Sequence, residues 1–470
     1  MPLELISPDE APASASSGLR HNILSPLEVL SQSISAIAPT TSPALTVPLI
    51  FAEAGNGTWL SYLLAATAML LMALSISYFA RTSASPGSLY KFATDSLPPW
   101  GGAAAGWALL LAYVATGSSV VGGFINYTGV LLRDLSPSAA SHLPAAAGPL
   151  LAIAVTTAAT LLAYRDVQTS TRLMLWIEAA SVSMILVVLA ILVVRHGPHV
   201  DTAQLKLQNV TLSQVRLGVV LSIFSFVGFE SATTLGHEAR NPLRTIPRAL
   251  IQSAVLSGLF FLLGSYVETF SFRQLNQNLA TSDAPFHALA PLAHVPIFAP
   301  LIDIGAFVSM FACTLACITA AARVLLKMAH DGLAHPHLGR AHAKNETPHI
   351  AVLVTGAAVL VPAAVLSARG VSGMDIYGYM GSLAVYGFLT IYFLVAAALP
   401  VFLRRRDQLT AAATVLAVVS AGAMVVAMAG TLYPVPDKPY DWLPYIYLAY
   451  LLAGLVWFAI VQARQRRATA

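Results

Sequence analysis

The stretch FSFVGFESATT, residues 224–234, decides how this chain folds. It lies inside the apolar run 215–238 and carries a glycine, Gly228, and an ionisable carboxylate, Glu230. Unwound backbone or a carboxylate inside hydrocarbon costs several kcal/mol unless it lines a polar cavity or is buried within protein. The stretch therefore predicts a broken membrane helix with a polar site at the break.

The composition is that of an integral membrane protein. The chain has 470 residues, of which 57% are apolar and 10% charged, whereas a soluble protein carries roughly 25% charged residues. Its mean hydropathy of +0.72 leaves too little polar surface for a water-soluble protein of this size. The pI near 9.0 suggests nucleic acid, but the basic residues lie in short clusters between apolar runs, so we exclude a nucleic-acid partner.

Long apolar runs recur along the whole chain. A bilayer-spanning helix needs about 20 predominantly apolar residues, and neither a soluble domain nor a β-barrel gives many uninterrupted runs of that length. The sequence therefore predicts an all-α polytopic membrane protein with about 12 transmembrane helices. The predicted spans are 28–52, 58–80, 99–132, 147–164, 173–194, 215–238, 247–270, 298–329, 349–368, 375–402, 411–433 and 442–462.

The basic residues predict the orientation. With the N-terminus in the cytoplasm, most of the 25 Lys and Arg residues fall in cytoplasmic loops, as the positive-inside rule requires. Both termini are therefore expected to be cytoplasmic, in a multi-pass protein of the cell inner (plasma) membrane. Residues 1–25 are rich in Ser, Ala and Pro, with no basic segment before an apolar core, so they predict a disordered cytoplasmic tail rather than a signal peptide.

The first span contains a second break. Residues 33–44 read SISAIAPTTSPA, and two prolines four residues apart, Pro39 and Pro43, should unwind the helix near mid-membrane. Spans one and six occupy equivalent positions in two five-span halves. Paired interrupted segments of this kind indicate an inverted-repeat transporter with its site at the breaks. The halves share no residue-level identity, so the repeat is inferred from the breaks alone.

Motifs next to the breaks resemble the amino acid–polyamine–organocation (APC) superfamily. The stretch 226–242, FVGFESATTLGHEARNP, with 244–249, RTIPRA, closely resembles the sixth helix and following loop of bacterial APC amino acid permeases. Residues 85–90, SPGSLY, look like that family's loop between helices two and three. Arg323, the stretch 328–332 (MAHDG) and 347–348 are similar to its helix eight and the loop after it. The matches run in family order from about residue 25 to 410.

This resemblance implies five-plus-five inverted repeats, two extra C-terminal helices, and amino acid transport by alternating access. The implied divisions are a core at 26–410, with repeats at about 26–200 and 210–405, and C-terminal helices with a short tail at 411–470. One departure concerns helix one, where many relatives have a glycine-rich break. Here the segment is 36–40, AIAPT, and Pro39 has no N–H group to offer a substrate.

The breaks supply the predicted substrate site. Free N–H groups at the start of a half-helix suit a carboxylate, and free carbonyls at the end of one suit an ammonium. We expect N–H groups of Ala38, Thr40 and Thr41 in the first role and the carbonyls of 224, 225 and 227 in the second. The resemblance implies that Phe224 is a gating aromatic above the substrate. The alternative is that Phe224 only packs against lipid or the protein core. The predicted substrate-binding residues are Ala36, Ile37, Ala38, Thr40, Thr41, Ser42, Phe224, Ser225, Val227 and Gly228.

Two carboxylates are the proton-coupling candidates, Glu178 in span five and Glu230 at the second break. The resemblance implies that some relatives have a lysine at the position of Glu178, where its charge replaces a sodium ion. A protonated Glu178 could donate a hydrogen bond to a freed helix-one carbonyl. The alternatives are that Glu178 reaches water near the cytoplasmic end of its span, and that Glu230 only bonds N–H groups of the unwound helix. Hydroxyls in span eight keep sodium coupling open as well.

The remaining polar residues predict no catalytic or metal site. The histidines between 330 and 349 lack metal-ligand spacing and read as a solvated cytoplasmic loop, and Tyr113 reads as packing. There is no nucleophile–base pair and no phosphate-binding loop. The sequence therefore predicts no enzyme, no metal and no cofactor.

The predicted function is secondary active transport of amino acids, with protons as the candidate coupling ion and the lipid bilayer as surroundings. A polyamine or other organic-amine carrier of the same fold and a membrane-embedded amino acid sensor remain alternatives. The major facilitator fold also has twelve spans, but its halves are parallel six-span units without matched breaks in spans one and six.

Overall fold

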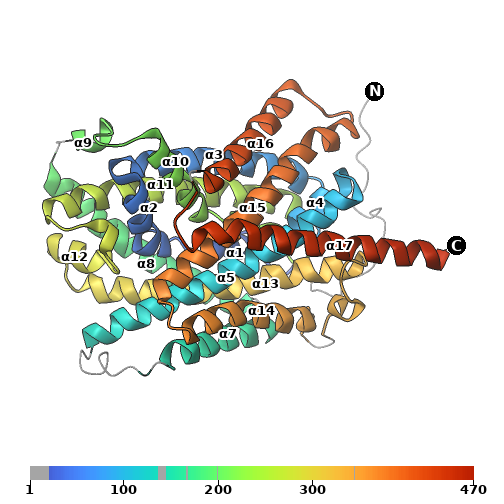
Figure 1. Ribbon diagram of the computed structural model, residues 1–470, viewed down its shortest axis with the longest axis horizontal. Coiled ribbons are helices and arrows are strands. Elements are labelled where there is room, and N and C mark those ends of the chain that lie inside the picture. Colours follow the sequence, from blue (N-terminus) through green and yellow to red (C-terminus); the bar gives the residue numbers. More distant parts are fainter. Residues whose placement is uncertain are drawn as a thin grey trace.

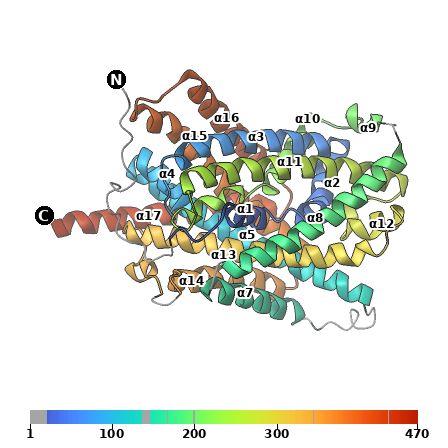
Figure 2. The same ribbon diagram turned by 180° about the vertical axis from the view of Figure 1, so that it is seen from behind.

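The computed structural model describes residues 21–135, 144, 146–165, 168–197, 200–342, 345–433 and 435–469. Regular structure in these residues is helical, and their one β-bridge joins Leu24 to Ala239. The helices run roughly along one direction and pack into a single bundle (Figures 1 and 2). The predicted all-α polytopic architecture is confirmed.

The described residues contain eleven helical segments long and apolar enough to cross a membrane. The first, Pro26–Ala80, has 55 residues, which at 1.5 Å per residue gives a length of roughly 80 Å against a hydrocarbon core of about 30 Å. It is long enough for two crossings and contains both predicted spans 28–52 and 58–80. The five-plus-five repeat itself stays an interpretation.

The first segment is divided in two by a short turn at Gly55. Before the turn lie α1 (Pro26–Ile37), the π-helical turn η1 (Ser42–Thr46) and α2 (Val47–Ala54), and after it lies α3 (Thr58–Ala80). The other helices are α4 (Ser88–Ser96), α5 (Pro99–Leu135), α7 (Ala147–Arg165), α8 (Gln168–His196), α9 (Thr202–Leu205), α10 (Leu212–Phe224), η3 (Phe229–Leu235), α11 (Pro242–Gln274), α12 (Pro285–Leu292), α13 (Phe298–His330), α14 (His349–Ala368), α15 (Gly373–Arg404), α16 (Ala411–Leu432) and α17 (Leu443–Thr469).

Burial separates central helices from peripheral ones. The apolar windows of α5, α13 and α15 are mostly buried, whereas those of α16 and α17 are mostly exposed. Figures 1 and 2 show α16, in orange-red, and α17, in red, on the outside of the bundle. Exposed apolar faces of this size suit lipid rather than water, which agrees with a bundle embedded in a bilayer.

Both predicted helix breaks are present. Helix α1 ends at Ile37, and Ala38 follows with a left-handed φ of 50°. Helix α10 ends at Phe224, and Gly228 adopts a φ of 97° before η3 begins. A Cβ atom on Gly228 would lie 2.8 Å from the Cβ and 2.9 Å from the carbonyl carbon of Ala36. The two breaks therefore touch at a point where only glycine fits.

The chain before α1 departs from the predicted tail. The amides of Ile23 and Leu24 each donate to the carbonyl of Glu238 at 2.9 Å, and the Arg240 amide donates to the Leu24 carbonyl at 2.8 Å. Because these backbone groups pair with the loop after η3, residues 22–25 belong to the folded body. Residues 1–20 of the predicted tail lie outside the described residues.

Candidate functional site

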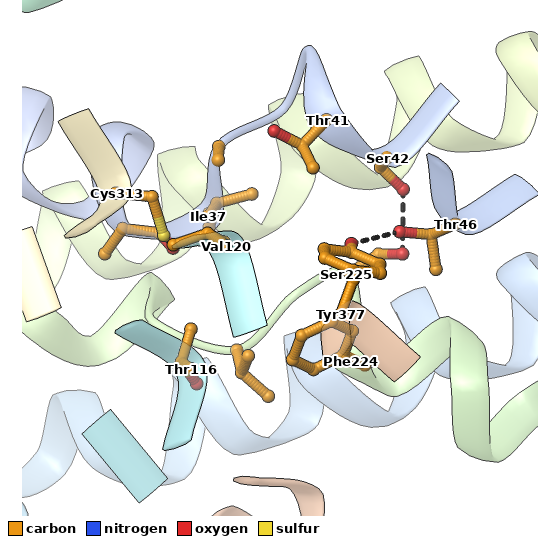
Figure 3. Close-up of a pocket in the computed structure, with 13 residues that line it drawn as sticks. Ile37, Thr41, Ser42, Thr46, Thr116, Val120, Phe224, Ser225, Cys313 and Tyr377 are labelled. Atoms are coloured by element: carbon orange, nitrogen blue, oxygen red, sulfur yellow. Dashed lines mark hydrogen bonds between the residues drawn. The ribbon is translucent and has the colours of Figure 1, made fainter. Parts of the chain in front are cut away.

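A small cavity lies between the two breaks (Figure 3). The space between its lining atoms is about 280 Å³, a volume that includes open solvent. None of its lining residues is charged. They are Ala36, Ile37, Ala38, Thr41, Ser42, Thr46, Thr116, Val120, Phe224, Ser225, Val227, Cys313 and Tyr377.

The structure brings most of the predicted substrate-binding residues together around this cavity. Two of them, Thr40 and Gly228, do not line it. The Thr40 side chain instead bonds to α8, and Gly228 packs on Ala36. Those that do line it are Ala36, Ile37, Ala38, Thr41, Ser42, Phe224, Ser225 and Val227.

Several lining residues come from helices that the sequence analysis did not assign to the site. Thr116 and Val120 lie on α5, Cys313 on α13 and Tyr377 on α15. The Cys313 thiol donates to the Ala36 carbonyl at 3.1 Å, so α13 contacts the first break through a hydrogen bond. The sequence signal that could have identified Thr116, Cys313 and Tyr377 was a hydroxyl or thiol group within a membrane helix. Many helices of this chain carry such groups, so the signal does not single these residues out.

A cluster of hydroxyl groups ties the two breaks together at the cavity wall. The Ser42 hydroxyl donates to the Ser225 hydroxyl at 2.7 Å, and the Tyr62 hydroxyl of α3 lies 2.8 Å from Ser42 and 3.0 Å from Ser225. Thr46 bonds in the same way to Tyr377 at 2.7 Å. These bonds fix the relative positions of the broken segments without any charge.

The Thr41 hydroxyl differs from its neighbours. It is buried and lines the cavity, and among the described residues it has no hydrogen-bond partner. Leaving a buried hydroxyl unpaired is unfavourable. A ligand that accepts a hydrogen bond at this position would therefore remove a cost that the protein otherwise carries.

The expectation of free N–H groups at the first break is wrong in this structure. The Ala38 amide donates to the Ile34 carbonyl at 3.0 Å, and the Thr41 amide donates to the Ala38 carbonyl at 2.9 Å. The Thr40 amide donates to Glu178 at 2.9 Å. The helix end, a tight turn and a side chain from α8 thus use the three amides that the sequence left open.

Glu178 holds the first break in place. Its side chain is buried, and one oxygen, Oε1, accepts hydrogen bonds from the Thr40 amide at 2.9 Å and the Thr40 hydroxyl at 2.8 Å. One alternative from the sequence was that Glu178 reaches water. The buried position of its side chain does not agree with that alternative. The carboxylate also accepts from an N–H group rather than donating to a carbonyl, contrary to the expected arrangement.

Glu230 has a similar role at the second break. It is fully buried and accepts hydrogen bonds from Tyr113 at 2.8 Å, from Tyr392 at 2.6 Å and from the Gly228 amide at 3.2 Å. Tyr113, expected to pack only, is thus a donor. These bonds match the alternative in which the carboxylate satisfies the unwound helix.

No metal site is evident in the part of the chain that the structure describes. It contains no group of three or more His, Cys, Asp or Glu side chains that could hold an ion. The thiols of Cys313 and Cys317 lie 4.0 Å apart and are not joined in a disulfide.

Comparison with known proteins identifies the family. The amino acid permease family model matches residues 28–467. Branched-chain amino acid permease BcaP of Bacillus subtilis is 29% identical over 320 residues, 64% of this chain and 66% of its own length. Cationic amino acid transporter 4 of Mus musculus is 25% identical, over 73% of this chain and 54% of its own length. The low-affinity putrescine importer PlaP of Escherichia coli K12 is 24% identical, over 64% of this chain and 66% of its own length.

The chain thus spans about two thirds of the bacterial relatives and about half of the mouse protein. The family match covers both breaks, the cavity between them and the eleven apolar segments, apart from the first two residues of Pro26–Ala80. The chain is therefore a multi-pass membrane transporter that belongs to the amino acid permease family of the APC superfamily.

Proposed function

We propose that the protein carries amino acids with neutral, aliphatic side chains across the cytoplasmic membrane by alternating access. The observation that carries this proposal is the uncharged cavity between the two helix breaks. Hydroxyl groups and backbone ends suit the polar part of an amino acid, and Val120, Ile37 and Phe224 supply apolar surface for its side chain.

The absence of charge among the lining residues separates the candidate substrates. Putrescine is a dication, and a cationic amino acid carries an extra positive charge on its side chain. Burying such a charge without a partner is strongly unfavourable, and no lining residue is a carboxylate. Of the substrates named for the three relatives, a branched-chain amino acid fits this cavity best.

The substrate's two charged ends would be bound by different groups. The unpartnered Thr41 hydroxyl is the donor available to the α-carboxylate, next to the bonded hydroxyls of Ser42 and Ser225. The α-ammonium would donate hydrogen bonds to backbone carbonyls of the two breaks, since a carbonyl oxygen has two lone pairs and can accept a second hydrogen bond. Phe224 and Tyr377, whose ring centroids lie 5.5 Å apart, would close one side of the cavity.

Counterflow into proteoliposomes tests this proposal directly. Vesicles preloaded with unlabelled L-leucine should take up labelled L-leucine, and unlabelled L-valine should compete well. Isoamylamine, which is leucine without its carboxylate, and leucine methyl ester should compete poorly. Efficient competition by isoamylamine or putrescine would favour the amine carrier. Ligand-induced thermal stabilisation without any counterflow would favour a sensor.

Three further statements stay proposals. They are that transport is coupled to protons, that both termini are cytoplasmic, and that the chain divides into a 26–410 core with the helices of 411–470 outside it. The assignment of Glu178 and Glu230 as proton-coupling groups also stays a prediction. Proton coupling and the roles of the two glutamates can be tested by uptake into sodium-free vesicles under an inward proton gradient. The wild type is compared with the Glu178→Gln and Glu230→Gln variants.

A further inference from the structure

Another buried carboxylate, Glu268, lies near the first break and has a different environment from Glu178 and Glu230. It belongs to α11 and its exposed fraction is 0%. Neither of its oxygens has a hydrogen-bond partner among the described residues. Glu178 and Glu230, by contrast, each accept bonds from N–H and O–H donors.

The position of Glu268 relates it to the first break. A Cβ atom on Gly264, one turn earlier in α11, would lie 3.7 Å from Glu268 Oε1, 3.9 Å from Pro43 Cβ and 4.0 Å from Leu189 Cδ1. The carboxylate therefore folds back over Gly264, next to η1 and α8. The missing side chain of Gly264 leaves it this space.

Two tyrosines connect Glu268 to the first break. Tyr62 of α3 and Tyr127 of α5 both lie within electrostatic range of Glu268. Tyr62 bonds to Ser42 and Ser225, and Tyr127 donates to the Ala44 carbonyl of η1 at 3.3 Å. A rearrangement of the first break would therefore change what these tyrosines offer to the carboxylate.

Several other titratable groups on the elements around α11 have partners of their own. Asp303 of α13 pairs with His287 of α12, and Arg273 near the end of α11 pairs with Asp201. Glu178 of α8 accepts from Thr40, and Glu230 of η3 accepts from Tyr113 and Tyr392. Glu28 caps its own helix, α1. On α8, His196 bonds to Gln274 and Arg195 donates to the Leu292 carbonyl.

An ionised carboxylate in this place would have neither a counterion nor a hydrogen-bond donor. That arrangement is strongly unfavourable inside a membrane protein, and binding a proton removes the charge. We propose that Glu268 is a proton-binding site that loads and releases one proton in each transport cycle. The inference rests on the transport function proposed above and names the coupling ion and its site.

The cycle is simple in chemical terms. Loading transfers a proton from hydronium on the outer side to a Glu268 oxygen, so that an O–H bond forms and a water molecule is left. Helix α11 ends on that side about six residues, or about 9 Å, beyond Glu268. In the alternative conformation the first break moves, donors or water reach the carboxylate, and the O–H bond breaks. The proton then passes to water on the cytoplasmic side.

The test uses purified full-length wild type, Glu268→Gln and Glu268→Asp in sodium-free proteoliposomes. Glutamine has the shape and neutrality of the protonated side chain, so Glu268→Gln should keep leucine counterflow. Wild type should accumulate leucine up to about tenfold per unit of pH gradient at one proton per substrate. Glu268→Gln should accumulate none, and Glu268→Asp, which keeps a carboxyl group, should retain gradient-driven accumulation.

A second measurement does not depend on the substrate. The infrared spectrum of the wild type should contain the carbonyl band of a protonated carboxylic acid, and Glu268→Gln should lack it. Glu178→Gln and Glu230→Gln are matched controls that should keep the band. If leucine shows no counterflow with the wild type, the proposed function fails, and the infrared band still decides whether Glu268 holds a proton.

Three results would overturn the inference. The first is gradient-driven accumulation by Glu268→Gln equal to that of the wild type. The second is an infrared spectrum in which Glu268→Gln loses no carboxylic acid band. The third is accumulation by the wild type that follows a sodium gradient and ignores the pH gradient.

Discussion

At the scale of single residues, the Thr41 hydroxyl provides the sharpest test of the substrate site, because it is buried in the cavity without a partner. Thr41→Val keeps the side-chain shape and removes the hydroxyl. A hydrogen bond to a charged group contributes about 1.5–3 kcal/mol, so Kd for leucine should rise about ten- to hundredfold. Calorimetric titration of the detergent-solubilised protein measures this change.

Two controls accompany this variant. Thr41→Ser retains the hydroxyl and should bind leucine within a few-fold of the wild type. Isoamylamine has no carboxylate, so the wild type and Thr41→Val should bind it equally weakly. An unchanged leucine Kd in Thr41→Val would show that the carboxylate binds elsewhere.

At the scale of secondary structure, the contact between the two breaks depends on Gly228. Residue 228 has a left-handed φ of 97°, and a side chain at this position would clash with Ala36. The strain from φ alone is about 1–2 kcal/mol, and the clash adds to it because backbone atoms cannot move aside easily. Gly228→Ala should therefore abolish leucine uptake while the protein still inserts into the membrane, as uptake assays and membrane immunoblots would reveal.

Gly370 offers a matched control for this variant. It has a φ of 80°, and a Cβ atom there would meet nothing within 4 Å. Gly370→Ala thus carries the backbone strain without the clash, and it should lower the melting temperature slightly while uptake continues. Equal loss of uptake in both variants would mean that strain, rather than contact between the breaks, explains the effect.

At the scale of the whole molecule, a buried ion pair joins α13 to the loop after η3. The Arg323 guanidinium donates to both Glu238 oxygens, at 2.8 and 2.7 Å, and Arg323 is 1% exposed. Removing one partner leaves a buried charge unpaired and costs about 3–5 kcal/mol. Arg323→Met should therefore lower the melting temperature in detergent markedly, and Arg323→Met combined with Glu238→Gln should recover part of it.

An ion pair nearer the surface provides the comparison. Lys91 and Asp95 lie four residues apart on α4 and are partly exposed, at 31% and 38% of their side-chain surfaces. Helix pairs of this kind contribute about 0.3–0.5 kcal/mol, so Lys91→Met should leave the melting temperature nearly unchanged. A loss as large as that of Arg323→Met would contradict the reasoning from burial.

The sequence by itself determined the membrane class, the apolar spans and the two breaks. These features are local, because a run of about 20 apolar residues must span the bilayer and because Pro39, Pro43 and Gly228 act on their own stretch of backbone. The same locality let the sequence pick most of the residues that line the cavity.

Only the tertiary structure decided what each polar group touches. Thr40 and Thr41 are neighbours in sequence, yet the first bonds to Glu178, 138 residues away, and the second faces the cavity. Glu268 is one acid in an apolar run, and only the packing of α11 reveals that it has no partner. The reason is geometric: the face that a helix turns to its neighbours, and hence each side chain's surroundings, depends on how all the helices pack.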